Sequence, residues 1–337
     1  MSLTITTIVP TFHRPDKLDR AINSALSQSY RDLIVSVYDN ASGDSTQAVV
    51  QRLAEQDARV RYIRRSENIG AAANFIRAFN DVTTPLCSFL SDDDYLLPGF
   101  FERAGLALHR DEQAGMFAGS TLEHDESGTL RYAPLLSWPR EGRYEAGQSV
   151  LRMFGNQHPT WTGIVFRTEA LRAAGGLDPA ASAALDFDAE LRVAAMFPII
   201  VSFAPSAIYT VHPGSVSSGE TARVIPAFER MIDKTQSSRV LPVELRRKVA
   251  AGLQRQLQMK LLEISVKAQL RGDRAAAREA ALLLRDTHGS PWLGSLSVAG
   301  LWFSNRVPAA HALLASLERG RVARRAARAR RQVAALG

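Results

Sequence analysis

The sequence has a single cysteine, Cys87, among its 337 residues. One thiol cannot form an intramolecular disulfide, which excludes a disulfide-stapled secreted scaffold and favours a cytoplasmic protein. Cys87 lies in the apolar run of residues 86–90, where we predict a buried structural thiol. The chain does not open on a basic segment followed by an apolar stretch and a cleavage site, so we expect no secretory signal.

Long hydrophobic runs are also missing. The apolar stretch of residues 292–303 is much shorter than the roughly 20 residues that span a bilayer, so it predicts a core or interfacial helix. Residues 10–15 contain no glycine, which argues against the Gly-rich loop of a nucleotidyltransferase. No aromatic residue lies among residues 319–331 and no nucleic-acid-binding motif occurs, so we expect no nucleic-acid partner.

Charge is unevenly distributed along the chain. Residues 225–337 hold 21 Lys and Arg against 8 Asp and Glu, whereas residues 1–224 hold 20 against 26. This contrast predicts a boundary near residue 220. Arg321, Arg324, Arg328 and Arg331 share a helix face by their spacing. They indicate peripheral attachment to the anionic inner face of a membrane, with a solvated tail as the alternative.

The first hundred residues alternate β-branched apolar runs with helical patterns. Strands are expected at residues 3–9, 33–38, 60–63 and 86–90, with a helix between each pair. Repeated units of this kind predict an α/β fold, a mostly parallel Rossmann-like sheet flanked by helices. Later patterns predict helices at 99–110, 148–154, 168–174 and 186–197, with strands at 163–166 and 199–203. From residue 226 onward the pattern is helical throughout.

Polar residues follow three of the predicted strands. Pro10-Thr11 ends the first, Asp39-Asn40 the second, and Asp92-Asp93-Asp94 the fourth. Because ligands bind beyond the carboxyl ends of parallel strands, these clusters are expected to converge on one crevice. Three adjacent carboxylates repel one another, and oxygen ligands suit Mn²⁺ or Mg²⁺. The sequence therefore predicts a cation at Asp92, Asp93 and Asp94, the alternative being an acidic turn or helix start.

Several ordered segments together resemble the inverting family 2 glycosyltransferases with the GT-A fold. They are residues 8–14 (IVPTFHR), 21–30 (AINSALSQSY), 37–46 (VYDNASGDST), 68–70 (NIG) and 89–98 (FLSDDDYLLP). The similarity covers residues 3 to about 110 and continues more weakly to about 217. It implies a nucleotide-sugar-binding half at 1–110, an acceptor-binding half at 111–220 and a basic helical region at 225–337.

The resemblance implies roles for matching positions. Pro10, Thr11 and Arg14 would line the nucleotide pocket, and Asp39 would accept a hydrogen bond from a uracil-like base, unless it only forms an Asx turn. Asn68 and Gly70 would lie near the ribose or base. The cation that bridges the phosphates would be held by the acidic cluster. Asp92 would also contact the nucleotide-sugar donor. Ser91 replaces an Asp that is common at this position in the family. His212 would reach the cation or the diphosphate, the alternative being a surface histidine.

The residues of the acceptor half follow from the same resemblance. Asp186 matches the expected general base, although Leu185 replaces the acidic residue usual before it. Asp186 and Asp188 cannot share a helix face, so one of them should point into the site; we favour Asp186, the alternative being helix N-terminal charge for both. His158 and Trp161 are expected to stack on the acceptor sugar, with a core tryptophan as the alternative.

The sequence thus predicts a metal-dependent inverting glycosyltransferase of the hexosyltransferase type. It would use a nucleotide-diphosphate-sugar, with a UDP-sugar favoured, and a glycan or lipid-linked acceptor in cell-surface polysaccharide synthesis. The departures at Ser91 and Leu185 leave an alternative, a degenerate domain that binds a nucleotide or glycan without catalysis.

Overall fold

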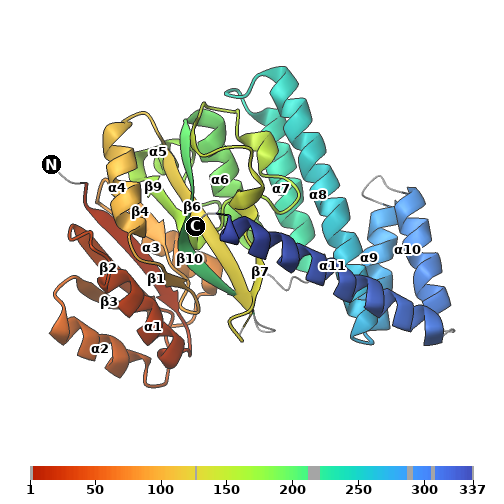
Figure 1. The fold of residues 1–337 in the computed structure, drawn as a ribbon, viewed down its shortest axis with the longest axis horizontal. Coiled ribbons are helices and arrows are strands. Elements are labelled where there is room, and N and C mark those ends of the chain that lie inside the picture. Colours follow the sequence, from red (N-terminus) through yellow and green to blue (C-terminus); the bar gives the residue numbers. More distant parts are fainter. Residues whose placement is uncertain (1–2, 126, 212–220, 287–290, 305–307, 336–337) are drawn as a thin grey trace. The chain divides into compact units, whose positions relative to one another are not determined.

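The computed structural model describes residues 3–125, 127–211, 221–286, 291–304 and 308–335. It forms two compact units, one of residues 1–179, 185–212 and 329–337 and the other of residues 180–184 and 213–328. The first unit contains a sheet with strand order β3-β2-β1-β4-β9-β6-β10-β5, to which β7 and β8 add at the side (Figure 1). The domain boundaries at residues 110 and 220–225 stay predictions.

The strands of the sheet have the following bounds: β1 Ile5–Thr11, β2 Leu33–Asp39, β3 Val60–Arg64, β4 Leu86–Phe89, β5 Tyr95–Leu96, β6 Met116–Asp125, β7 Leu130–Tyr132, β8 Gly142–Tyr144, β9 Ile164–Arg167 and β10 Ile199–Val211. The helices of the first unit are α1 Pro15–Leu26, α2 Thr46–Gln56, α3 Ala71–Asn80, α4 Phe100–Arg110, α5 Thr168–Ala173 and α6 Leu185–Met196, with 3₁₀ turns such as η2 Val150–Arg152 and η3 Trp161–Gly163.

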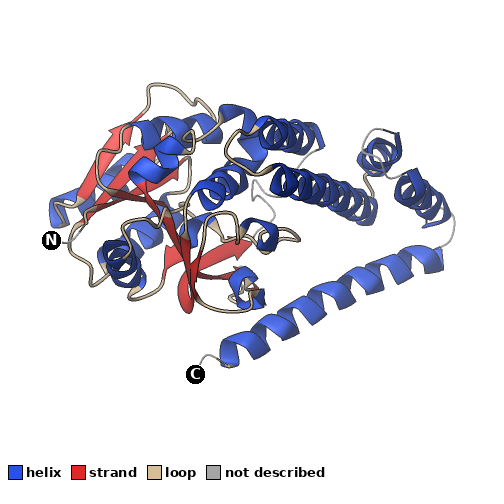
Figure 2. Cartoon of the chain, turned by 90° about the horizontal axis from the view of Figure 1, so that it is seen from above, coloured by secondary structure: helices blue, strands red, loops and turns tan. Residues whose placement is uncertain are grey.

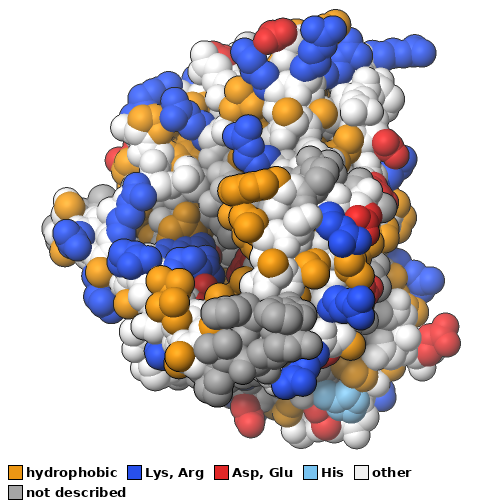
Figure 3. Space-filling view, turned by 90° about the vertical axis from the view of Figure 1, so that its right-hand side faces the viewer, with side chains coloured by type: hydrophobic (Ala, Val, Ile, Leu, Met, Phe, Trp, Pro, Cys, Tyr) orange, Lys and Arg blue, Asp and Glu red, His pale blue; other side chains and the backbone are white. Residues whose placement is uncertain are grey.

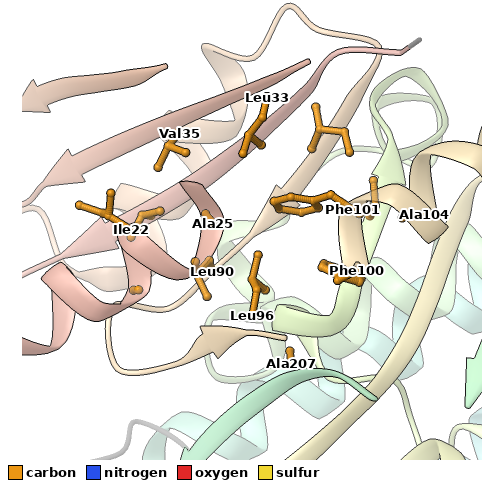
Figure 4. Close-up of a cluster of buried hydrophobic side chains, with 14 of the residues drawn as sticks. Ile22, Ala25, Leu33, Val35, Leu90, Leu96, Phe100, Phe101, Ala104 and Ala207 are labelled. Carbon is orange, nitrogen blue, oxygen red and sulfur yellow. The ribbon is translucent and has the colours of Figure 1, made fainter. Parts of the chain in front are cut away.

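The sheet is parallel from β3 to β4, as the βα repeats predict, and mixed beyond β4. Alternation along β4 sends its side chains to two helical layers. Leu86 and Leu90 join the core under α1 and α4, which Figure 4 shows in close-up. Phe89 points to the other face and packs against Phe75 and Phe79 of α3. Helices therefore cover both sides of the sheet, as Figure 2 shows.

Two expectations need correction. The helix expected at residues 148–154 is only the 3₁₀ turn η2, because Gly147 and Gly155 bracket it with positive φ angles of 79° and 73°. The strand expected at residues 199–203 extends to Val211 as β10, which pairs along its length with β6. This pairing carries β10 to the edge where the predicted site lies.

The second unit is helical in its described residues, as predicted for the C-terminal region. It contains α7 Thr221–Ser237, α8 Val243–Leu270, α9 Arg274–Asp286, α10 Pro291–Ser304 and most of α11 Pro308–Ala334. Ala268, Ala277 and Ala281 pack with Leu301 in its interior. Small alanines let α8 and α9 approach closely, which explains the Ala-rich composition of this part of the chain.

The backbone at Gly163 leaves no room for a side chain. A Cβ there would lie 2.3 Å from Thr121 Oγ1 and 2.8 Å from the carbonyl oxygen of Gly119. We expect Gly163→Ala to lower the free energy of unfolding by about 1 to 3 kcal/mol through overpacking, measured by urea denaturation. The matched control is Gly43→Ala, where the nearest atom is 3.9 Å away. Equal stabilities of the two variants would contradict this prediction.

Candidate nucleotide and catalytic site

The loops after β1 and β2 hold each other in unusual backbone conformations. His13 and Ala41 have positive φ angles of 56° and 67°, which non-glycine residues rarely adopt. The backbone N–H of His13 donates to Ser42 Oγ (2.9 Å), and that of Asn40 donates to the carbonyl oxygen of Thr11 (3.0 Å). Strain of this kind gathers at functional sites, and here it lies at the carboxyl ends of two adjacent parallel strands. Pro10, the next-to-last residue of β1, is half-buried there.

Asp39 ends β2 and is fully buried. Its Oδ1 accepts the backbone N–H of Ser42 (2.8 Å), the contact of an Asx turn, and its Oδ2 accepts the hydroxyl of Tyr62 (2.6 Å). Burial and this carboxylate raise the pKa of Tyr62, so the phenol stays protonated and donates. Sequence reasoning missed Tyr62, whose only signal is its position in the strand beside β2.

Asn68 and Gly70 form the turn that begins α3. Asn68 Oδ1 accepts from Asn40 Nδ2 (2.7 Å) and from the backbone N–H of Gly70 (2.9 Å). The positive φ of Gly70, 83°, is one that glycine adopts without steric cost. Both residues are exposed, and through Asn40 they are tied to the end of β2.

The first two carboxylates of the acidic cluster bind the loop after β1. Asp92 Oδ2 accepts from Thr11 Oγ1 (2.9 Å), while Arg14 Nη1 donates to Asp92 Oδ1 (3.1 Å) and to Asp93 Oδ2 (2.6 Å). The carbonyl oxygen of Asp93 accepts from Arg20 Nη2 (2.6 Å). The predicted residues Thr11, Arg14, Asp92 and Asp93 thus lie together, with one guanidinium between two carboxylates.

Asp94 points elsewhere, and its contacts were not anticipated. It is fully buried; its Oδ2 accepts from Thr162 Oγ1 (2.5 Å) and its Oδ1 from the backbone N–H of Thr210 (2.9 Å). Thr162 belongs to η3 and Thr210 to β10, so the third carboxylate connects the motif to the later part of the unit. Sequence reasoning missed both threonines because neither stands in a polar cluster.

The carboxylates of this cluster are buried and repel one another, so additional positive charge would stabilise their ionised forms. Burial first, and the charge of Asp93 second, raise the pKa of Asp92 and raise that of Asp94 to about 8. Asp92 and Asp93 supply adjacent oxygen donors, and a Mg²⁺ or Mn²⁺ site often uses one or two carboxylates together with phosphate oxygens. The donor set therefore fits such a cation at Asp92 and Asp93, whereas Asp94 is fully buried and faces Thr162 and Thr210 instead.

Among the described residues, no three His, Cys, Asp or Glu side chains converge as a complete metal site. A cation at Asp92 and Asp93 would accordingly need oxygens from its substrate. His212, the fourth predicted ligand, lies outside the described residues.

Helix α6 separates its acidic residues onto two faces. Asp188 is buried and accepts from Arg192 Nη2 (2.7 Å), four residues later. Asp186 is half-buried, and its Oδ1 accepts the backbone N–H of Phe187 (2.8 Å). Asp188 is thus engaged in an ion pair, whereas Asp186 makes no ion pair with a Lys or Arg in the part of the chain that the structure describes.

The two predicted acceptor residues have different environments. Trp161 is 7% exposed and packs among Phe75, Phe89 and Phe166, with ring centroids as close as 4.2 Å. It therefore occupies the core position that was the alternative to sugar stacking. His158 is half-buried, and its Nδ1 lies 2.9 Å from Oε2 of the buried Glu190.

The sheet order, the helices on both faces and the acidic motif after β4 define the GT-A class of nucleotide-sugar enzymes. Residues 6–175 match the family described as Glycosyl transferase family 2, and the chain belongs to this family. The suspected relationship and the fold class are thereby confirmed.

Two curated relatives are similar over shorter stretches. A GalNAc(5)-diNAcBac-PP-undecaprenol beta-1,3-glucosyltransferase of Campylobacter jejuni is 36% identical over 96 residues, 28% of this chain and 31% of the relative. Glycosyltransferase GlyA of Streptococcus pneumoniae is 24% identical over 156 residues, 46% of this chain and 22% of the relative. The chain thus spans less than a third of the length of each.

Solved structures share the fold at low identity. S. aureus TarS 1-349 in complex with UDP-GlcNAc superimposes with a TM-score of 0.65 and 14% identity, covering 90% of this chain and 92% of that one. The mannosyltransferase PcManGT of Pyrobaculum calidifontis, in complex with GDP-Man and Mn²⁺, gives a TM-score of 0.54 and 17% identity over 94% and 79%. These likenesses extend over the helical C-terminal region as well.

The guanidinium of Arg14 lies where the acidic cluster needs positive charge. In EDTA we expect Arg14→Gln to lower the free energy of unfolding by about 1 to 2 kcal/mol. This is less than the loss expected on breaking a fully buried ion pair, because the Arg14 side chain is 31% exposed. Adding MnCl₂ should raise the melting temperature of Arg14→Gln more than that of the wild type, since the ion meets no competing guanidinium.

The control for this measurement is Arg31→Gln, which removes an exposed arginine. Its response to MnCl₂ should equal that of the wild type. If Arg14→Gln also responded as the wild type does, the carboxylates would not be the cation site.

Proposed function

We propose that this chain is an inverting glycosyltransferase. It moves a sugar from a nucleotide-diphosphate-sugar to a hydroxyl of a glycan or lipid-linked acceptor, in cell-surface polysaccharide synthesis. The observation that carries this proposal is the meeting of Thr11, Arg14, Asp92 and Asp93 at the carboxyl ends of β1 and β4, in a member of family 2. The undecaprenol-linked acceptor in the name of the Campylobacter relative supports the choice of acceptor class.

The donor site begins at Asp39. A buried carboxylate with a free lone pair on each oxygen accepts the imide N–H of uracil, which favours a UDP-sugar. Ser42 and Tyr62 fix its orientation through the two hydrogen bonds described above. The exposed Asn68 and Gly70 are placed to meet the ribose or base, and UDP-GlcNAc in the TarS structure supports a UDP-sugar.

Asp92 and Asp93 are the residues that we propose to hold Mn²⁺ or Mg²⁺. When bound there, the ion offsets the charge of the departing diphosphate. Arg14 supplies a second positive charge beside it, and Thr11 fixes Asp92 through its hydroxyl. Of the three predicted carboxylates we propose only Asp92 and Asp93 as ligands, because Asp94 accepts hydrogen bonds from Thr162 of η3 and Thr210 of β10.

Asp186 is the proposed general base. It takes the proton of the acceptor hydroxyl as that oxygen attacks the anomeric carbon and the nucleotide diphosphate leaves with the electron pair. Asp188 cannot serve this role as readily, because its carboxylate is buried and paired with Arg192. A general base must accept the proton of the acceptor hydroxyl, which a carboxylate held in an ion pair does poorly.

The test is release of nucleotide diphosphate from UDP-Glc, UDP-Gal, UDP-GlcNAc, UDP-GalNAc and GDP-Man, each with MnCl₂, MgCl₂ or EDTA. We expect turnover with a UDP-sugar and loss of turnover in EDTA. Asp186→Asn should lower kcat by about 100-fold or more while leaving the Kd for UDP unchanged.

The result for Asp188→Asn separates the two candidates for the base. This variant should lose folding stability because Arg192 is left without its carboxylate partner, and it should retain turnover at temperatures where it is folded. If Asp188→Asn instead abolished turnover with UDP binding intact, our assignment of the base would be wrong. Nucleotide binding without turnover of any donor would indicate the non-catalytic binding module.

We also propose that the second unit attaches to an anionic membrane surface. No helix among the described residues is long and apolar enough to cross a membrane.

Two pairs of exposed apolar side chains are spaced one turn apart: Trp292 and Leu296 on α10, and Leu313 and Leu317 on α11. Arg324 and Arg328 continue the face of Leu317. Figure 3 shows a face on which hydrophobic and basic side chains are interspersed. Apolar anchors beside basic residues suit an anionic leaflet.

Vesicle sedimentation tests this attachment. Removing two basic residues with Arg324→Gln/Arg328→Gln should weaken binding to phosphatidylglycerol-containing vesicles by about 30-fold, at roughly 1 kcal/mol for each charge. Leu313→Gln/Leu317→Gln should weaken binding as well, whereas Met259→Gln, an exposed apolar residue on α8, serves as the control. Equal binding to neutral and anionic vesicles would contradict the proposal.

A further inference from the structure

Glu190 is a buried carboxylate that the reaction described above does not use. It lies four residues after Asp186, so the two share one face of α6, while Asp188 and Arg192 share another. Glu190 is fully buried; its Oε2 meets His158, and its Oε1 has no hydrogen-bond partner among the residues that the structure describes. A carboxylate in this environment is costly unless a positive charge accompanies it.

His158 supplies that charge. Its Nδ1 lies 2.9 Å from Glu190 Oε2, and its ring packs on Phe187 with centroids 4.8 Å apart. Burial by itself lowers the pKa of His158, but the charges of Glu190 and Asp186 outweigh burial and raise it to about 9. The ring contacts Phe187, which directly follows Asp186, and Glu190, which lies one turn after Asp186 on the same face of α6.

The segment of residues 158–163 also fixes where His158 lies. Thr162 is bound to Asp94 of the acidic motif, and Gly163 packs tightly against β6. Four residues before Thr162, His158 reaches α6. The same short segment thus contacts the acidic motif at one end and the helix of Asp186 at the other.

We infer that His158, held by Glu190, is the residue that positions the carboxylate of Asp186 for proton transfer. This inference rests on the proposed function and extends it. During transfer the acceptor O–H bond breaks, its proton passes to Asp186, and the anomeric carbon exchanges its bond to the diphosphate oxygen for one to the acceptor oxygen. His158 and Glu190 neither gain nor lose a proton; the positive charge of the imidazolium beside this face of α6 favours one orientation of the Asp186 carboxylate. Leu185, the apolar residue before Asp186, offers no such support.

The test compares Glu190→Gln and His158→Ala with the wild type, using the UDP-sugar of the panel that is turned over fastest. Both variants should lower kcat by about 10- to 100-fold, less than loss of the general base itself, and leave KM for the donor and the Kd for UDP unchanged. Glu190→Gln keeps the side-chain shape and an acceptor for His158, so it should fold; the increase in melting temperature with UDP verifies this. Glu169→Gln, an exposed residue of α5, is the control and should keep the wild-type kcat.

Chemical rescue separates a charged role from simple packing. Added imidazole should restore part of the kcat of His158→Ala, whereas pyrazole, of the same size but uncharged at neutral pH, should not. Rescue by both compounds equally, or an unchanged kcat in Glu190→Gln, would overturn the inference while leaving the glycosyltransferase function standing. Absence of turnover by the wild type with every donor would instead overturn the proposed function, and the inference with it.

Discussion

Repulsion among three consecutive carboxylates at the end of β4 is the constraint around which this site is organised. The three carboxylates are accommodated in two ways: Asp92 and Asp93 share the guanidinium of Arg14, and Asp94 accepts hydrogen bonds from Thr162 and Thr210. The loop after β1, the turn η3 and the strand β10 are all drawn to one place because the acidic motif needs donors from each. Loss of any of these partners would leave a buried carboxylate with less compensation for its charge.

The buried carboxylates of helix α6 are also each compensated by a partner, but their partners are separate residues. Asp188 is neutralised within the helix by Arg192, one turn later. Glu190 is neutralised from outside the helix, by His158. A helix that carries three acidic residues in five positions can be buried because its periodicity sends them to different partners. Asp186 is the least buried of the three carboxylates, which suits a group that must meet substrate.

Much of the fold could be predicted from the sequence because periodicity reports on local burial. The βα units up to β4 follow alternating and helical patterns, and they were expected within a few residues. Strand β6 was missed because Gly119, Ser120 and Thr121 interrupt its apolar pattern, and its stability comes from pairing with the distant β9 and β10. The residues of the candidate site likewise fall into those that the sequence predicts and those that only the structure reveals. Asp39 and Asp92 follow strands directly and could be found, whereas Tyr62, Thr162 and Glu190 acquire their contacts only through tertiary packing.

The segment from His158 to Gly163 restricts where insertions and deletions can be tolerated in this chain. Its two anchors are set by the distance between the acidic motif and α6, so an insertion or deletion between His158 and Thr162 would detach one end. Surface turns such as the one closed by Gly128 carry no such restriction, since open space surrounds that glycine. Length variation is therefore expected in the turn between β6 and β7, and conservation of spacing in the four-residue step from His158 to Thr162.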